Sequence, residues 1–212
     1  MTPRTEALTV AGPAGALQCA LDRPEPAAQA PRGVAVFCHP HPLHGGTLDN
    51  KVVVTMARAA VLLGYAATRF NFRGVGRSEG RWDEGRGEID DALAVIAAAR
   101  ALCAAGLPLL IGGFSFGGYV ASQAAARLGG EVSRLVLVSP AAENFEVARV
   151  PPHTLVVQGE ADDVVPMRAV LDWARPQGLP VLVIPGGGHF FHGQLGLLKQ
   201  ILLDTLAPRV AL

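Results

Sequence analysis

Two serines of this chain stand in a Gly-x-Ser-x-Gly pattern, and the surroundings of only one of them are typical of a nucleophile. Ser115 follows the apolar run 107–111 and precedes 118–128, which has the composition of a helix. A serine at a sharp turn from a buried strand into a helix exposes its hydroxyl at the end of the strand. The helix N-terminus also directs N–H groups toward developing negative charge. We therefore expect Ser115 to be a nucleophile.

The second serine of this pattern, Ser78, lies among charged residues and has no apolar helix directly after it. This setting is typical of a loop serine or a serine that caps a helix. We expect no nucleophilic role for Ser78. For Ser115 the remaining alternative is a tight turn without chemistry.

A serine hydroxyl needs a general base, and the base needs a carboxylate that orients it. For a nucleophile at such a turn, the expected chain order is serine, acid and then histidine, each after the C-terminal end of a strand. The apolar run 155–157 leads into a turn that carries Glu160, Asp162 and Asp163. We expect Asp162 to be the acid, with Asp163 as second choice. The alternative is that all three are solvated turn and N-cap residues.

The expected base lies in the last polar loop of the chain. The apolar run 181–184 leads into Pro-Gly-Gly-Gly and then His189, ahead of the closing helix. A glycine run gives a histidine the mobility that a general base needs, so we expect His189 to be the base. His192 is the alternative, as a misassigned base or as a histidine at the start of the helix.

Acyl transfer also needs two hydrogen-bond donors for an oxyanion. One is expected to be the backbone N–H of Phe116, the residue after the nucleophile. We expect the second from the loop after the strand 34–38, where Pro40 and Pro42 have no N–H of their own. The backbone N–H of His41 is our candidate, and that of Leu43 is the alternative.

The same loop has a second interpretation, as a metal site. His39, His41 and His44 approximate the HxHxDH motif of metallo-β-lactamase-type hydrolases, although Leu43 stands where that motif has its aspartate. A metal would leave the turn at Ser115 unexplained, so we expect no metal and no cofactor. The simplest role for the three histidines is to shape the loop through hydrogen bonds.

The elements that must position these residues alternate along the chain. Two strands, 7–10 and 16–21, flank a Gly-Pro-Ala-Gly turn and predict a hairpin. After a Pro/Ala loop over 24–32, further strands are predicted at 34–38, 65–70, 107–112, 135–138, 155–157 and 181–184. Helices are predicted at 50–63, 84–105, 118–128, 167–174 and 195–206. A hairpin followed by β-α units predicts an α/β fold with a mostly parallel sheet and helices on both faces. No linker divides the chain, so we expect one domain over residues 1–212.

Composition narrows the classes of protein. Half of the 212 residues are hydrophobic, 17% are charged and the formal net charge is zero. The chain is too apolar for disorder, and its charge indicates no nucleic-acid or anionic-membrane partner. Cys19, Cys38 and Cys103 form no disulfide framework. With no leader pattern near the start and no run long enough to span a membrane, we expect a soluble cytoplasmic protein.

Three stretches of the chain resemble the α/β-hydrolase superfamily: 39–51, 71–78 and 113–118. The chain from about Val34 onward is most similar to small lidless bacterial hydrolases related to carboxylesterases and dienelactone hydrolases. In that family the Arg-Gly-x-Gly-x-Ser stretch is a structural loop, which implies that Ser78 is not catalytic. Dienelactone hydrolases have a cysteine where Ser115 stands, so lactone specificity does not follow. Only a short segment, residues 141–152, separates Pro140 from the next strand, which implies that no lid is inserted.

These observations predict a serine hydrolase that cleaves small to medium soluble carboxylic esters through an acyl-enzyme. A thioesterase, a peptidase or an acyltransferase would use the same triad, and a binding module on a retired hydrolase fold is the non-catalytic alternative. The expected partner is a small-molecule ester, with the chain a monomer or homodimer. Several apolar residues are candidates either for an acyl pocket or for the core: Phe114, Phe116, Phe145, Val147, Phe190 and Phe191.

Overall fold

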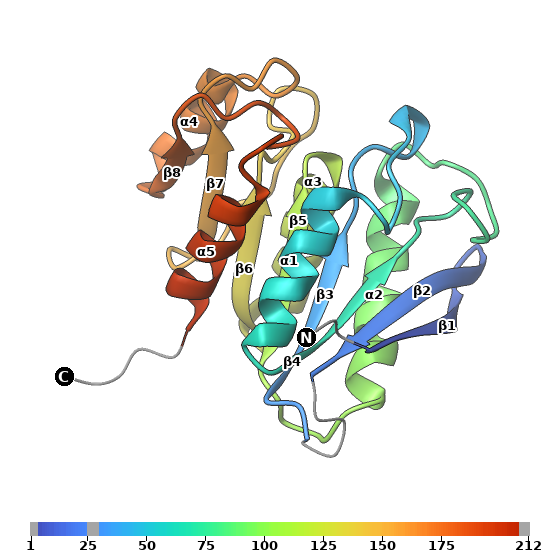
Figure 1. The fold of residues 1–212 in the computed structure, drawn as a ribbon. Coiled ribbons are helices and arrows are strands. Elements are labelled where there is room, and N and C mark those ends of the chain that lie inside the picture. Colours follow the sequence, from blue (N-terminus) through green and yellow to red (C-terminus); the bar gives the residue numbers. More distant parts are fainter. Residues whose placement is uncertain (1–3, 25–29, 208–212) are drawn as a thin grey trace.

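The computed structural model describes residues 4–24 and 30–207, whose strands form a single mixed sheet (Figure 1). Its order is β1-β2-β4-β3-β5-β6-β7-β8. The pairs β1–β2 and β2–β4 are antiparallel, and all later pairs are parallel. The strands are β1 Arg4–Gly12, β2 Gly15–Arg23, β3 Gly33–Cys38, β4 Tyr65–Phe70, β5 Leu109–Phe114, β6 Val132–Val138, β7 Leu155–Gly159 and β8 Val181–Ile184. The predicted hairpin and α/β class are confirmed.

Helices cover both faces of the sheet, and each face buries its own apolar cluster. In Figure 1, α1 and α5 lie side by side in front of the sheet, and α2 and α3 lie behind it. The strands between them read as continuous apolar runs because both of their faces are buried. The helices are α1 Lys51–Leu62, α2 Arg86–Ala101, α3 Phe116–Leu128, α4 Met167–Ala174 and α5 Leu195–Leu206. Short 3₁₀ turns span Pro42–His44, Gly129–Glu131 and Arg175–Gln177.

Most predicted elements differ from the observed ones by a few residues at one or both ends, and two of these differences have a clear local reason. The helix predicted over 84–105 is shorter at both ends, since Glu84 and Gly85 have positive φ (55° and 90°) and Leu102 is the C-cap. The strand predicted over 107–112 runs instead from Leu109 to Phe114. Its glycines stay in the ladder because Phe37 of β3 packs where a Cβ on Gly112 would lie, 2.7 Å from the ring.

The connection between β6 and β7 is short and irregular. Residues 139–154, all of which the structure describes, form turns but no helix or strand. No lid is therefore inserted at this point, as expected. Part of the predicted loop 24–32, namely residues 25–29, lies outside the described residues. Within the described ranges, no helix has both the length and the apolar character to cross a membrane.

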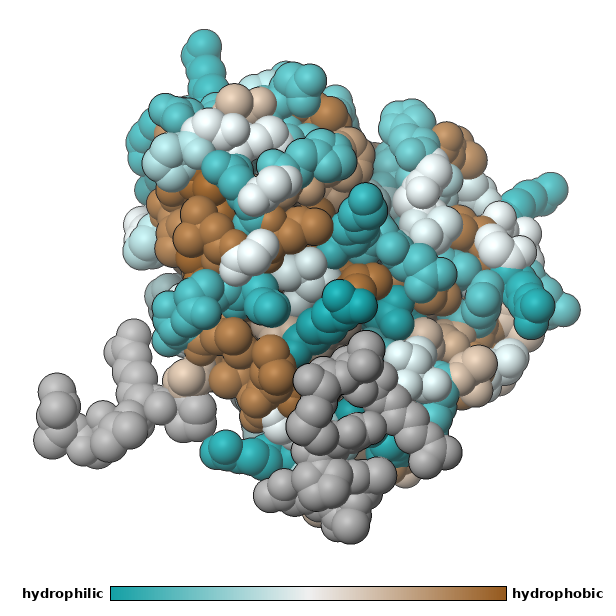
Figure 2. Space-filling model, in the orientation of Figure 1, coloured by the Kyte–Doolittle hydropathy of each residue, from teal (hydrophilic) through white to brown (hydrophobic). Residues whose placement is uncertain are grey.

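The edge strand β8 leaves apolar surface exposed. Leu182 and Val183 are more than one third exposed, and Leu197 of α5 is about half exposed. Figure 2 shows brown, hydrophobic surface over this side of the molecule, near β8 and α5. The number of subunits stays a prediction.

Candidate functional site

Ser115 occupies a strained turn between β5 and α3. Its φ is 57° and its ψ is −120°, a combination that costs a non-glycine residue free energy. Neighbouring chain fixes this conformation: the Ser115 N–H donates to the Val138 carbonyl (3.0 Å), and its own carbonyl accepts from Ala141 N (3.2 Å). The end of β6 therefore holds the serine backbone in place.

Glycines are required on both sides of Ser115. A Cβ on Gly113 would lie 1.9 Å from the Gly117 carbonyl oxygen, and a Cβ on Gly117 would lie 2.2 Å from the Cys38 carbonyl oxygen. Neither partner is a side chain that could move aside. The Gly-x-Ser-x-Gly spacing thus has a steric cause: strand, turn and helix approach too closely for any side chain at these two positions.

Asp162 and His189 form a buried pair. His189 Nδ1 lies 2.9 Å from Asp162 Oδ2 and 3.0 Å from Oδ1, and both residues are less than 8% exposed. With Nδ1 engaged by the carboxylate, Nε2 is the nitrogen that remains for proton exchange. Phe114 packs against the imidazole, with ring centroids 4.8 Å apart. The ring orientation is therefore fixed by both a hydrogen bond and packing.

The Asp162 carboxylate also accepts several other hydrogen bonds. Its Oδ1 accepts from the backbone N–H groups of Val164 (3.0 Å) and Val165 (2.8 Å). Burial acts to raise the pKa of this carboxyl, but the hydrogen bonds from His189 and Val165 and the His189 charge outweigh burial, so its pKa is lowered. Asp162 is therefore ionised at neutral pH and can orient an imidazolium.

Sequence reasoning missed one further partner of this carboxylate, Gln158. Its side chain is fully buried, and Nε2 donates to Asp162 Oδ2 (3.2 Å) and to the Val165 carbonyl (2.9 Å). The only sequence signal was an amide inside the otherwise apolar strand β7. A buried amide has to be hydrogen-bonded, which was reason to look for a polar neighbour.

Backbone hydrogen bonds join the loop that carries Asp162 to the loop that carries His189. Ala161 N donates to the Gly187 carbonyl (2.9 Å), and Glu160 N donates to the Ile184 carbonyl (3.0 Å). A Cβ on Gly159 would lie 2.3 Å from the Gly187 carbonyl oxygen, so the two loops are in close contact. Gly187, in the run before His189, makes this close contact, and the mobility expected of the run stays a prediction.

The second-choice residues lie elsewhere. Asp163 and His192 are both exposed, and Glu160 is exposed and accepts from Gly186 N (2.9 Å). Of the three carboxylates in the loop, Asp162 alone is buried against a histidine. The geometry therefore favours the first-choice pair over both alternatives.

Ser115 and His189 open into one cavity of about 200 Å³ at the carboxyl edge of the strands. In Figure 1 this edge faces upward, where the loops before α5 and after β3 lie. Of the six apolar residues proposed for an acyl pocket, only Phe190 lines this cavity; Phe114, Phe116, Val147 and Phe191 are buried and Phe145 is half-buried. The cavity wall also contains Pro40, His41, His44, Gly45, Gly46, Asn50 and Val164.

The loop that supplies His41 is ordered by its own side chains. His41 Nδ1 accepts from Leu43 N (3.2 Å), so this N–H already has a partner. The His41 ring stacks on His44 at 4.4 Å, and partial burial together with the charge of His44 lowers the His41 pKa. Phe116 is the first residue of α3, where N–H groups have no partner within the helix. The Leu43 N–H is therefore less available as second oxyanion donor, and His41 stays our candidate.

His39 is buried, and both of its ring nitrogens are hydrogen-bonded. Its Nδ1 lies 2.6 Å from the Pro40 carbonyl and its Nε2 lies 3.1 Å from Phe72 N, which makes it a neutral ring with both nitrogens bonded. Complete burial lowers its pKa to about 4, the Pro40 hydrogen bond opposes this shift, and the charge of His41 adds to it. Across residues 4–24 and 30–207, no group of three His, Cys, Asp or Glu side chains is arranged to hold a metal. The loop-shaping role fits His39.

Ser78 lies in the loop that follows β4 and is fully hydrogen-bonded. Its Oγ donates to the Asn71 carbonyl (2.7 Å) and accepts from Gln18 N (2.9 Å). Nearby, Arg73 forms a buried ion pair with Asp91 (2.8 Å). The Arg-Gly-x-Gly-x-Ser stretch is therefore hydrogen-bonded to strand β2 of the hairpin. In the described structure its serine has no histidine partner.

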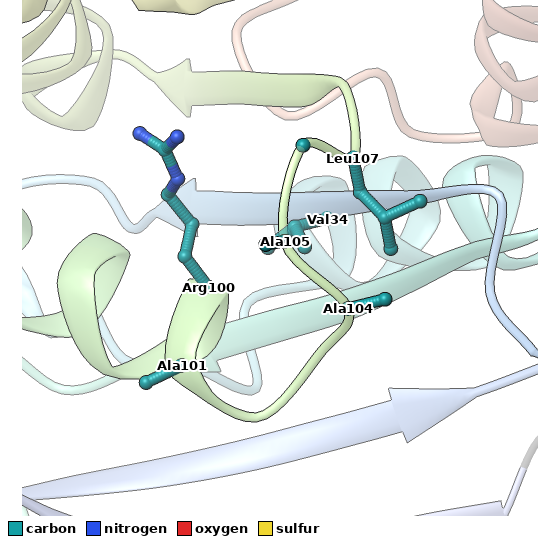
Figure 3. A pocket seen from close by; sticks show the side chains of 7 residues that line it. Val34, Arg100, Ala101, Ala104, Ala105 and Leu107 are labelled. Carbon is teal, nitrogen blue, oxygen red and sulfur yellow. The ribbon is translucent and has the colours of Figure 1, made fainter.

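A larger cavity, of about 280 Å³, lies near the N-terminal ends of β3 and β5 (Figure 3). Arg100 is its only charged lining residue, and the rest are Val34, Ala101, Ala104, Ala105, Gly106 and Leu107. The Arg100 guanidinium is paired with Glu131. This cavity contains no nucleophile and no base, so volume alone does not identify the reactive site.

The chain resembles known proteins in sequence and in structure. A family model described as alpha/beta hydrolase fold matches residues 43–153. A protein of Rickettsia prowazekii is 32% identical over 186 residues, which cover 82% of this chain and 78% of the relative. A serine hydrolase without a lid from Xanthomonas campestris is 39% identical and superposes with a TM-score of 0.89 over 100% of this chain and 99% of its own. An alpha-beta serine hydrolase homologue from Coxiella burnetii, also 39% identical, has a TM-score of 0.84 with 98% and 99% covered.

Proposed function

This chain belongs to the α/β-hydrolase family, and on that premise we propose that it is a serine esterase that uses Ser115, His189 and Asp162 as its catalytic triad. The observation that carries the proposal is the Asp162–His189 pair, 2.9 Å apart, at the wall of the cavity onto which Ser115 opens. The 39% identical relatives described as serine hydrolases support hydrolase chemistry.

Each group has a defined part in the proposed reaction. The Ser115 hydroxyl attacks the ester carbonyl carbon, while His189 Nε2 takes its proton. Asp162 holds Nδ1 and stabilises the imidazolium. The negative oxygen of the tetrahedral intermediate accepts hydrogen bonds from the backbone N–H groups of Phe116 and His41.

The intermediate collapses when the C–O bond to the alcohol breaks and His189 returns its proton to the leaving oxygen. A water molecule then attacks the acyl-enzyme, with His189 again taking the proton. His189 then returns that proton to Ser115 Oγ as the bond between the acyl carbon and Ser115 breaks, which releases the carboxylic acid and restores the serine. Besides the ester and water, no step needs a further reactant.

A fluorophosphonate probe followed by peptide mass spectrometry tests the assignment, because it reacts with activated serines. We expect modification of Ser115, loss of labelling in His189→Ala, and hydrolysis of p-nitrophenyl acetate that the probe abolishes. Labelling at Ser78 would show that the wrong serine is assigned. A folded protein that neither reacts with the probe nor cleaves the ester would exclude the esterase and favour a binding module.

A further inference from the structure

A second cavity lies directly beside the serine pocket. It has a volume of about 260 Å³, and Asn50 and Phe190 line both cavities. Phe190 is 43% exposed, so its side chain contributes surface to both spaces. A ligand that reacts at Ser115 can therefore reach the second cavity by passing Asn50 and Phe190.

The second cavity adjoins the proposed proton donor. The ring of Phe190, which lines both cavities, lies 5.0 Å from the His189 imidazole and 6.0 Å from the ring of His192, which lines the second cavity but not the serine pocket. In the proposed reaction the leaving oxygen must lie where His189 can protonate it. The alcohol part of the ester is thus the part that extends toward this cavity.

Five polar residues, with charges of both signs, line this cavity together with Val52 and Phe190, and by area its wall is more apolar than polar. Asp49 accepts from Arg69 Nη1 (3.1 Å), and Lys51 is exposed at the cavity. Asn50 Oδ1 is occupied by the N–H groups of α1, so its amide nitrogen is the part that can donate to a ligand. The hydroxyl of Thr47 and the imidazole of His192 complete the polar lining.

This combination suits an uncharged group with several hydroxyls. An anion would face Asp49 and a cation would face Lys51, whereas an alkyl alcohol would use only the apolar part of the wall. Hydroxyls can both donate and accept, and the exposed Phe190 ring offers apolar contact to the C–H groups between them. The serine pocket has no acidic residue, lysine or arginine in its wall and a volume of only about 200 Å³, which suits a small neutral acyl group.

We propose that the cavity lined by Thr47, Asp49, Asn50, Lys51, Phe190 and His192 binds the alcohol part of the substrate, and that this alcohol is a polyol such as glycerol or a sugar. The substrate is then a short-chain acyl ester of a polyol. This inference rests on the proposed esterase function and adds the identity of the leaving group.

Two acetates of three-carbon alcohols test it, glycerol 1-acetate and n-propyl acetate, with acid release followed in a pH-stat. Both share the acyl group and chain length and differ only in two hydroxyls. We expect kcat/KM to be about tenfold or more higher for glycerol 1-acetate, mainly through KM, because hydroxyls matched by a site are strongly selected. A ratio of one or less would overturn the polyol site while leaving the esterase proposal standing. Hydrolysis of neither acetate, with no fluorophosphonate labelling, would instead remove the esterase proposal itself.

A matched pair of lysine variants locates the effect. Lys51→Met removes one donor of the cavity, and we expect the ratio of kcat/KM values for the two acetates to fall toward one. Lys199→Met, at the only other lysine of the chain, lies on α5 and is expected to keep the wild-type ratio. An unchanged ratio in Lys51→Met, or an equal fall in both variants, would contradict the assignment of this cavity.

Discussion

The amide of Gln158 joins the carboxylate of Asp162 to the carbonyl of Val165, through hydrogen bonds of 3.2 Å and 2.9 Å from the same nitrogen. These hydrogen bonds hold the loop that carries Asp162 against the end of β7. Because Asp162 is hydrogen-bonded to His189, we expect Gln158 to be a positioning residue for the proposed base.

Replacing Gln158 with methionine, which has similar shape but no donor, tests this role. We expect kcat to fall about ten- to hundredfold with KM nearly unchanged, because a misplaced base slows chemistry more than binding. The free energy of unfolding should fall by about 1–3 kcal/mol, since the Val165 carbonyl loses its partner. Steady-state kinetics and urea unfolding measure the two effects.

The control is Gln200→Met, at an exposed position of α5, where the amide donates to Asp204 (2.8 Å). Wild-type kcat is expected there. If Gln158→Met had wild-type kcat while its stability fell, the amide would serve the fold alone.

Ser78→Ala is expected to retain full turnover per folded molecule, although the serine stands in the same five-residue pattern as the nucleophile. The loss of its two buried hydrogen bonds should lower the free energy of unfolding by about 1–3 kcal/mol. Ester hydrolysis at saturating substrate, together with chemical denaturation, checks this. A hundredfold loss of turnover in folded protein would contradict the structural role.

Gly117→Ala is expected to reduce turnover more than a hundredfold, since the new Cβ would lie 2.2 Å from the Cys38 carbonyl and displace the turn. Overpacking at such a contact should also cost about 1–3 kcal/mol of stability. Gly130→Ala, where the added Cβ meets open space, is the control and should match wild type in both measurements. Equal behaviour of the two variants would argue against the steric requirement.

His39 makes stability depend on pH. The unfolded chain binds a proton at this histidine near pH 6.5, whereas the folded chain resists until about pH 4. Its contribution is therefore complete above about pH 6.5 and is lost as the pH falls from there to about 4. A shift of this size corresponds to roughly 3 kcal/mol.

We expect His39→Gln to be less stable than wild type at pH 7 but to lose less free energy of unfolding between pH 7 and pH 4. Glutamine can still accept a hydrogen bond from Phe72 N but does not titrate. Urea unfolding at several pH values provides the comparison. If the free energy of unfolding changed with pH in the same way for both proteins, His39 would not be the source of the pH dependence.

Much of this fold follows from apolar runs and turn residues, because strands buried on both faces leave a plain pattern. Helix α4 and strand β4 begin and end at the predicted residues. The first turn of α3 could not be found in this way, since its start depends on the strained φ of Ser115, which a hydrogen bond to the neighbouring strand β6 helps to fix.

The candidate site, like the fold, could be predicted only in part from the sequence. Ser115, Asp162 and His189 can be proposed from motif and chain order, because each must follow a strand that ends at the same edge. Gln158 could not, since its role depends on the turn that brings Val165 back over β7. Neither could the difference between Phe190 and Phe191, which are adjacent in sequence but exposed and buried, respectively.

The short connection between β6 and β7 determines what an acyl group on Ser115 would encounter. With no inserted helix there, Val164 and Phe190, which line the serine cavity, stay exposed. An acyl-enzyme in such a site faces bulk water, the most concentrated acceptor in solution. We therefore expect it to partition to the free acid even when another alcohol is supplied, so that hydrolysis prevails over transesterification.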